Sequence, residues 1–285
     1  MACTEADFAY LRSVVYEQSA NKLDASRDYL FESRLQRLLR TTGLRTLDGL
    51  VAALRRQPDA AIKRSIAEAM TINETSFFRD HAPFEMMRLE LIPELIRRRE
   101  SCRRLRFWSA ACSTGQEGYS LAMILCEHFP QLRDWRVEII GTDISKEVIA
   151  RAQAGRYQRL EVNRGLPARL LVKYMHRVEE EWEVVPELKR KCRFHQRNLC
   201  SGPMLLEQYD GILLRNVMLY FSSETRQRLL RNLHRVLAPD GFLILGSSEQ
   251  PELPGHFQAV VQYNGCYYKP LPQRFDMDSA AGPGC

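Results

Sequence analysis

A turn of small residues is the first candidate for chemistry in this chain. Residues 107–119 read FWSAACSTGQEGY, an apolar run that enters a turn with little side-chain bulk, and the following SLAMILC is apolar enough for a helix packed on a sheet. A strand-to-helix turn of this kind lets the backbone approach a ligand closely. The match to the G-x-G-x-x-G fingerprint is poor, and tight turns of this type also occur as plain fold geometry. The turn at Ala110–Gly118 is therefore either a ligand-binding loop or an ordinary connection between a strand and a helix.

An acidic residue ends the next apolar run. Residues 137–143 read VEIIGTD, which places Asp143 at the tip of a predicted second strand, about 28 residues after Gly115. In nucleotide-binding α/β folds, a carboxylate at this position accepts hydrogen bonds from ribose hydroxyls. The same side chain would also serve as the N-cap of a helix that starts near Ser145. Both roles are compatible with the sequence.

The segment Met70–Asp80 has no helical or strand period. It reads MTINETSFFRD and combines two adjacent aromatic residues with hydroxyl groups, an amide and one arginine, Arg79. It is either an ordinary linker packed by Phe77 and Phe78 or the lining of a site between two domains.

Histidines and cysteines give no sign of a metal centre. The six histidines form no acid–base pair and no metal-ligand spacing, so surface or packing roles are expected. The eight cysteines include no C-x-x-C pair, and a chain of 285 residues needs no disulfide framework. Reduced thiols and no bound metal are therefore predicted.

Composition bounds the location and the partners. The sequence after Met1 has neither a basic nor an apolar leader region, and no apolar run reaches the roughly 18 residues that span a bilayer. A cytoplasmic monomer without membrane insertion is expected. The net charge of +6 is mild for this length, and no basic patch with interleaved aromatics is present, so nucleic acid is not an expected partner.

The elements that must position these residues begin with helices. Apolar side chains recur at helical spacing through residues 1–70, so a small all-helical domain is predicted, and residues 82–99 resume a helix. Thr46 and Asp59 are expected as N-caps and Gly43 as a C-cap.

Basic side chains concentrate in the second half of this helical region. Residues 34–64 hold eight basic and two acidic side chains, and three of the arginines are spaced three apart, so that they would share a helical flank. This surface is either a solvated face or a docking surface for an acidic partner helix. The candidate docking residues are Arg34, Arg37, Arg40, Arg55 and Arg56.

From Leu105 onward, strands and helices alternate. Strands at 105–110 and 137–142 and helices at 116–127 and 145–154 indicate a parallel sheet with covered faces. The expected continuation is a strand at Tyr209–Asn216, a helix at Ser222–Leu237, a turn at Asp240-Gly241, a strand at Phe242–Gly246 and an antiparallel hairpin around Tyr263-Asn264-Gly265. This doubly wound α/β pattern fits a methyltransferase-type fold better than a dehydrogenase.

Residues 155–198 interrupt the alternation. A short helix is expected to open at Gly165-Leu-Pro167, and the runs 177–185 and 188–194 are predicted to form a small inserted hairpin. Residues 193–199 would return to the sheet and place Asn198 at a strand tip. The predicted organisation is a helical substrate-docking domain at 1–72, an α/β domain at 73–270 with an inserted β-hairpin subdomain at 175–197, and a flexible tail at 271–285.

Taken together, the chain strongly resembles the CheR family of chemotaxis receptor glutamate O-methyltransferases. The resemblance runs from about residue 8 to about residue 269. It is carried by six ordered motifs: MTINETSFFR at 70–79, WSAACSTGQE at 108–117, GTDIS at 141–145, RGLP at 164–167, RNVMLYF at 215–221 and GSSE at 246–249. One departure is Gly118, where the family usually has proline; it removes no side-chain contact.

The resemblance implies a cofactor, a substrate and a set of site residues. The cofactor would be S-adenosylmethionine, the product S-adenosylhomocysteine, and the partner the cytoplasmic helical domain of a methyl-accepting chemotaxis protein. Apart from the resemblance, Arg79 and Tyr220 are the candidate catalytic residues. Arg79 either holds the substrate carboxylate near the methyl group or forms a salt bridge beside a helix, and Tyr220 either donates a hydrogen bond to the same carboxylate or packs in the core. The implied cofactor contacts are Asn73, Thr75, Arg79, Glu117, Asp143, Asn198, Leu199, Asn216 and Val217, and the candidate site also includes Ala110, Gly115 and Arg215.

The implied chemistry agrees with the side chains that are present. Methyl transfer from a sulfonium to a carboxylate needs no general base, because a glutamate with a pKa of about 4.3 is ionised at neutral pH. The site must supply positioning and a partly dry cavity. A non-catalytic S-adenosylmethionine-binding scaffold and a methyltransferase for RNA or a small molecule are the alternatives on the same fold.

Overall fold

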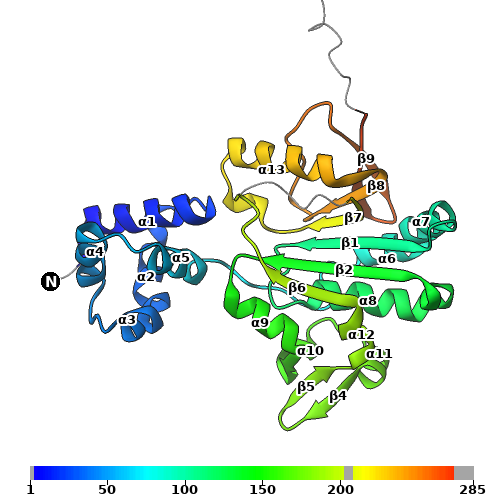
Figure 1. The fold of residues 1–285 in the computed structure, drawn as a ribbon, viewed down its shortest axis with the longest axis horizontal. Coiled ribbons are helices and arrows are strands. Elements are labelled where there is room, and N and C mark those ends of the chain that lie inside the picture. The colour runs from blue at the N-terminus through cyan, green and yellow to red at the C-terminus, as the bar shows by residue number, and fades with distance from the viewer. Residues whose placement is uncertain (1–2, 202–207, 273–285) are drawn as a thin grey trace, which may run out of the picture.

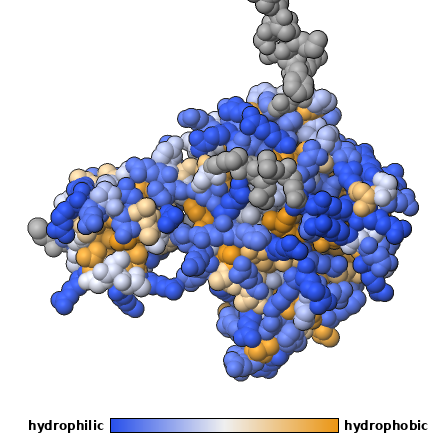
Figure 2. All heavy atoms as spheres, viewed as in Figure 1, coloured by the Kyte–Doolittle hydropathy of each residue, from blue (hydrophilic) through white to orange (hydrophobic). Residues whose placement is uncertain are grey.

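The computed structural model describes residues 3–201 and 208–272 of the chain. They fold into a helical part and an α/β part, and strands β1 (Arg104–Ala110) and β7 (Tyr209–Leu214) of the α/β part point toward the helical part (Figure 1). The predicted tail at 271–285 falls mainly outside the described residues. The visible face is mostly hydrophilic, with scattered apolar spots (Figure 2).

Among the described residues, the helical part is built from five α-helices and a 3-10 turn, and several of the helices have caps that the sequence predicts. Thr46 Oγ1 accepts a hydrogen bond from Gly49 N, Asp59 accepts from the backbone of the next turn, and Gly43 ends a helix at φ 72°, so the three expected caps are confirmed. Leu35, at φ −88° and ψ 0°, divides the predicted arginine flank between two helices. The elements are α1 (Glu5–Ser19), a 3-10 turn (Ala25–Arg27), α2 (Tyr29–Arg34), α3 (Gln36–Thr42), α4 (Leu47–Arg56) and α5 (Ala60–Ala69).

The α/β part confirms the predicted fold class, a doubly wound, mostly parallel sheet that ends in an antiparallel hairpin. The sheet order is β6-β2-β1-β7-β8-β10-β9; the first five strands pair in parallel, and β10 pairs antiparallel with β8 and β9. The strands are β1 (Arg104–Ala110), β2 (Arg136–Asp143), β6 (Cys192–Gln196), β7 (Tyr209–Leu214), β8 (Leu237–Leu245), β9 (Phe257–Gln262) and β10 (Gly265–Pro270). The covering helices are α6 (Ala82–Met86), a π-turn (Met87–Leu91), α7 (Ile92–Arg99), α8 (Gln116–His128), a 3-10 turn (Pro130–Asp134), α9 (Lys146–Ala154) and α13 (Ser223–Val236).

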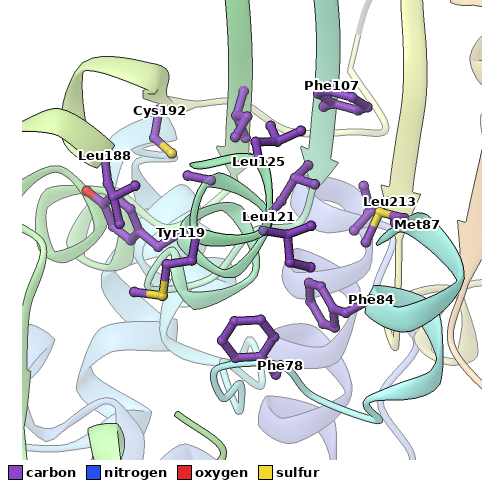
Figure 3. Close-up of a cluster of buried hydrophobic side chains, with 14 of the residues drawn as sticks. Phe78, Phe84, Met87, Phe107, Tyr119, Leu121, Leu125, Leu188, Cys192 and Leu213 are labelled. Carbon is purple, nitrogen blue, oxygen red and sulfur yellow. The ribbon is translucent and has the colours of Figure 1, made fainter. Parts of the chain in front are cut away.

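Helix α8 lies at the centre of the largest apolar core. In Figure 3, Leu121 and Leu125 lie between Phe107 of β1 and the aromatic pair Phe78 and Phe84, whereas Tyr119 lies beside Leu188. The Phe78 backbone N–H donates to Ser120 Oγ on α8, 3.0 Å away. The segment after α5 is thereby fixed to the helix that begins at the small-residue turn.

The inserted subdomain differs from the prediction. Its three-stranded sheet has the order β3-β5-β4, formed by β3 (Arg156–Gln158), β4 (Met175–Val178) and β5 (Glu181–Val184), with α10 (Arg159–Asn163) and α11 (Ala168–Tyr174) between β3 and β4. The predicted hairpin strand at 188–194 is wrong, because Pro186 begins helix α12 (Pro186–Lys191) and Cys192–Gln196 belongs to the main sheet. The hairpin therefore lies within 175–184.

Two predicted turns are also shifted. In the C-terminal hairpin, the central turn residues are Tyr263 and Asn264, with φ of 48° and 58°, while Gly265 already pairs with Gln262. The predicted turn at Asp240-Gly241 is an irregularity inside the continuous strand β8, where the register against β7 shifts.

An ion-pair cluster joins elements near the amino ends of β7 and β8. Arg99 Nε contacts Asp210 at 2.8 Å, and its Nη2 contacts Asp240 at 2.5 Å. This arginine, at the end of α7, therefore ties two strands to a covering helix.

Candidate functional site

A cavity lies at the carboxyl ends of the central strands, where the helical part meets the α/β part. It encloses about 950 Å³ of space not filled by atoms, part of it open to solvent. Eleven of the predicted site residues border it: Asn73, Thr75, Arg79, Glu117, Asp143, Asn198, Leu199, Arg215, Asn216, Val217 and Tyr220. Segments far apart in the sequence are thus brought together around one space.

Ala110 and Gly115 do not border the cavity. Ala111, with a φ of 61°, stands there in place of Ala110. Gly115 has a φ of 94°, and an added Cβ would lie 2.9 Å from the Cβ of Ala152. The glycine is required for the left-handed turn and for close packing on α9 rather than for a cavity surface.

Glu117 is held in a buried ion pair. Its Oε1 accepts from Ser109 Oγ at 2.6 Å, and its Oε2 accepts from Arg215 Nη1 at 2.9 Å. Arg215 Nη2 also donates to Asp80 Oδ2 at 2.7 Å and to the Arg79 carbonyl at 2.8 Å. The guanidinium of Arg215 therefore joins the small-residue turn to the loop that carries Arg79.

That loop has an unusual backbone. Phe78, Asp80 and His81 have φ values of 48°, 65° and 47°, a region that non-glycine residues rarely adopt. Such conformations persist where surrounding contacts fix them. Here Arg79 Nη1 donates to the Glu74 carbonyl at 2.8 Å, in addition to the Arg215 contact with its backbone. The structure thus holds the Arg79 side chain at the cavity wall.

Asp143 is not the N-cap of α9. That role belongs to Ser145, whose side chain accepts from Val148 N. Asp143 accepts from the backbone N–H of Ser145 at 3.0 Å and of Ser113 at 2.9 Å, and it borders the cavity. Burial raises the pKa of Asp143, and these hydrogen bonds from Ser145 and Ser113 oppose the rise. The result is a desolvated carboxylate suited to accept hydrogen bonds from hydroxyl groups.

The loop after β7 depends on a carboxylate that lies outside the cavity wall. Glu249 Oε2 accepts from Asn216 N at 2.7 Å and Gly246 N at 2.8 Å, while its Oε1 accepts from Met218 N at 2.7 Å. Asn216 has a φ of 58°, so this loop also needs external support. Glu249 belongs to the GSSE motif at 246–249, but the sequence alone assigns it no role.

Other wall residues were missed as well. Cys112 borders the cavity, and burial raises its pKa, so the thiol stays protonated rather than forming a nucleophilic thiolate. The further residues around the cavity are Ser19, Asn21, Thr71, Ile72, Glu74, Ala111, Ser113, Ile144, Arg197 and Phe221.

Two cavity residues indicate the kind of ligand that fits. Asn21 Oδ1 and Asn216 Oδ1 are buried acceptors without a hydrogen-bond partner among the described atoms, and both residues border the cavity. Buried acceptors of this kind call for a donor. Together with Asp143, they fit a ligand with several N–H and O–H donors, such as an adenosyl group that carries an amino acid.

The five predicted docking arginines do not form one free surface. Arg34 donates to the Thr71 carbonyl at 2.9 Å, and Arg55 contacts the Ala6 carbonyl at 2.9 Å and Asp7 at 3.3 Å, so these two have structural partners. Arg37 pairs with Glu147 of α9 at 2.7 Å. The remaining two, Arg40 and Arg56, are exposed.

Neither a metal-binding cluster nor a membrane-spanning helix is found among the described residues, 3–201 and 208–272. Within these ranges, no group of three or more His, Cys, Asp or Glu side chains is arranged to hold a metal ion. In the same ranges, no helix has both the length and the apolar character needed to cross a membrane.

Comparisons with known proteins agree on one family. The model described as "CheR methyltransferase, SAM binding domain" matches residues 73–265, and "CheR methyltransferase, all-alpha domain" matches residues 6–71. Chemotaxis protein methyltransferase 1 of Pseudomonas aeruginosa is 36% identical over 275 residues, covering 94% of this chain and 99% of that protein. Chemotaxis protein methyltransferase Cher2 of Pseudomonas putida is 34% identical with the same coverage. The chain therefore belongs to the CheR family of methyltransferases and contains its S-adenosylmethionine-binding domain.

Proposed function

We propose that this protein transfers a methyl group from S-adenosylmethionine to glutamate side chains on the cytoplasmic helices of chemoreceptors. The observation that carries the proposal is the shared cavity: Arg79 and Tyr220 border the same space as Glu117 and Asp143. Groups suited to a carboxylate substrate and groups suited to an adenosyl cofactor thus line the same cavity. The names of the relatives support a role in chemotaxis.

The cofactor residues would divide by chemistry. The carboxylate of Asp143 suits ribose hydroxyls, and Glu117, already balanced by Arg215, suits the cofactor's ammonium group. Asn198 is oriented by Cys200 N, which donates to its Oδ1 at 2.9 Å, and by the Gln18 carbonyl, which accepts from its Nδ2 at 2.6 Å. Because Asn198 is held in this way, we expect the adenosyl end of the cofactor to lie against the loops that follow β6 and β7.

The substrate residues need only hold an ionised carboxylate. When bound, S-adenosylmethionine supplies an electrophilic methyl group on a sulfonium for in-line attack. Arg79 would exchange its contact with the Glu74 carbonyl for the substrate carboxylate, and the Tyr220 hydroxyl would donate a second hydrogen bond. No general base is required, because the glutamate is ionised already. S-adenosylhomocysteine is the expected product, and no metal is needed.

The chemical nature of the product tests the proposal. After incubation with methyl-labelled S-adenosylmethionine and chemoreceptor cytoplasmic fragments, we expect label on the receptor that mild base releases as methanol. A carboxyl methyl ester behaves in this way, whereas methyl groups on nitrogen or on RNA bases resist mild base. Base-stable label would contradict glutamate methylation.

Two exposed arginines are the best test of receptor docking. Arg37 and its partner Glu147 have side chains that are 78% and 69% exposed, so their ion pair is weak and can give way to an acidic helix. We expect the double variant Arg37→Glu with Arg40→Glu to lower kcat/KM for the receptor about tenfold at low salt through lost charge complementarity. Its affinity for S-adenosylhomocysteine should be unchanged in a calorimetric titration.

A matched control separates docking from net charge. Arg231→Glu with Arg235→Glu makes the same charge change on exposed positions of α13, a helix of the α/β part. We expect this control to methylate receptor nearly as well as the wild type. Equal receptor methylation by both double variants would rule out the docking surface.

A further inference from the structure

We propose that the end of α1 is part of the cofactor site and that the Asn21 carboxamide accepts a hydrogen bond from bound S-adenosylmethionine. This inference rests on the cofactor use proposed above and extends it to the helical part, to which the sequence assigned only substrate docking. It makes the cofactor a bridge between the two parts of the molecule.

The position and burial of Asn21 are the first evidence. Asn21 and Ser19 border the cavity although they belong to the segment that ends α1. Asn21 is only 5% exposed, and its Oδ1 has no hydrogen-bond partner. Ser19 differs, because its Oγ already donates to the Val15 carbonyl at 2.7 Å. Asn21 is therefore the residue of this segment with unused hydrogen-bonding capacity.

Backbone contacts fix Asn21 at this place. Asn21 forms an antiparallel bridge with Phe221, and Lys22 N donates to the Tyr220 carbonyl at 2.9 Å. On the other side, Asn198 Nδ2 donates to the Gln18 carbonyl at 2.6 Å. The segment 18–22 is thus attached to the loop after β6, which carries Asn198, and to the loop after β7, which carries Tyr220. Because these contacts to the segment use its backbone, a change of the Asn21 side chain leaves them possible.

The chemistry of the unpaired atom selects the partner. A carbonyl oxygen accepts hydrogen bonds and does not donate them, so an ionised substrate carboxylate cannot satisfy Asn21 Oδ1. The cofactor carries suitable donors: the adenine amino group, the ribose hydroxyls and the ammonium group. A bound adenosyl cofactor therefore supplies what the buried carboxamide oxygen lacks.

Titration with S-adenosylhomocysteine tests this directly, without turnover. We expect Asn21→Ala to bind S-adenosylhomocysteine about tenfold more weakly than the wild type, the scale of one lost hydrogen bond. Asn21→Asp, which keeps an acceptor oxygen, should bind more tightly than Asn21→Ala. Asn163→Ala, at an exposed asparagine in α10, is the matched control and should bind like the wild type.

A second ligand locates the donor. 5′-Methylthioadenosine lacks the amino-acid end, so an equal loss for both ligands in Asn21→Ala places the donor in the adenosine half. A loss for S-adenosylhomocysteine alone places it on the ammonium group. Either pattern supports the proposal.

The contrary results are distinct. If Asn21→Ala and the shape-matched Asn21→Leu bind S-adenosylhomocysteine within twofold of the wild type, Asn21 is not a cofactor contact. Asn21→Leu also keeps the test decisive if Asn21→Ala melts at a lower temperature. If the wild type itself fails to bind S-adenosylhomocysteine, the proposed cofactor use fails instead.

Discussion

The Arg215→Met variant is expected to lose at least about 100-fold in kcat/KM and about 3–5 kcal/mol in the free energy of unfolding. The Arg215 side chain is 3% exposed and lies between Glu117 Oε2, at 2.9 Å, and Asp80 Oδ2, at 2.7 Å. Its removal leaves the buried carboxylate of Glu117 without a cation. It also frees the Arg79 carbonyl from the guanidinium, so the loop with positive φ angles loses a fixed point.

Denaturant unfolding and receptor methylation measure the two effects. Arg88→Met is a suitable control, because Arg88 pairs with Glu85 on the same helical segment but is 30% exposed, so its loss should cost less than about 1 kcal/mol. Adding Glu117→Gln to Arg215→Met should restore part of the stability, since the uncompensated charge is then gone. An Arg215→Met variant as stable as the control would show that the buried pair does not hold the site.

The Glu249→Gln variant is expected to lower kcat/KM about 100-fold, with about 2–3 kcal/mol lost from the free energy of unfolding. Both carboxylate oxygens accept backbone N–H groups, from Asn216, Met218 and Gly246. A glutamine places an amide N–H2 where one oxygen was, so at least one backbone donor then faces another donor. The loop from 215 to 220 should shift, and Tyr220 with it.

The kinetic pattern distinguishes positioning from a general loss of fold. Glu249 does not border the cavity, but Asn216 and Val217 of the loop that it supports do, so the variant should lower kcat and also raise KM for the cofactor. Glu252→Gln is the matched control, because Glu252 is more exposed and pairs with Arg226 at 2.6 Å. Unchanged kcat in a folded Glu249→Gln variant would show that the three backbone contacts do not position Tyr220.

The fold class could be predicted because helices and strands are specified largely by contacts between residues close together in the sequence. Thr46 and Asp59 start helices through contacts within one turn, and those N-caps were readable from spacing alone. Pro186 shows the limit of that reading. The sequence predicts a hairpin formed by the runs 177–185 and 188–194, whereas Pro186, which lies between these runs, begins helix α12. A short basic run after proline carries no clear period, so contacts with the sheet decided its conformation.

The sequence predicted only some of the site residues, because the site is formed by segments that are far apart along the chain. Asp143 and Asn198 are predicted to stand at strand tips, and the carboxyl ends of parallel strands meet at one edge of a sheet. Asn216 was predicted only through the family resemblance. Glu249 and Asn21 act through partners that are 33 and 200 residues away along the chain, and neither stands at a strand tip. The residues that support the cavity thus depend on how loops and domains pack, which local spacing does not encode.

The cluster of Arg99 with Asp210 and Asp240 lies near the amino ends of β7 and β8, whereas the cavity lies at the carboxyl ends of the strands. The residues that stabilise the sheet against heat and the residues of the proposed reaction therefore lie at opposite ends of the strands. Substitutions that strengthen or weaken the hold of α7 on β7 and β8 act a full strand length away from the reacting groups. For protein engineering, the amino ends of β7 and β8 are therefore the place to raise heat resistance without changing substrate preference.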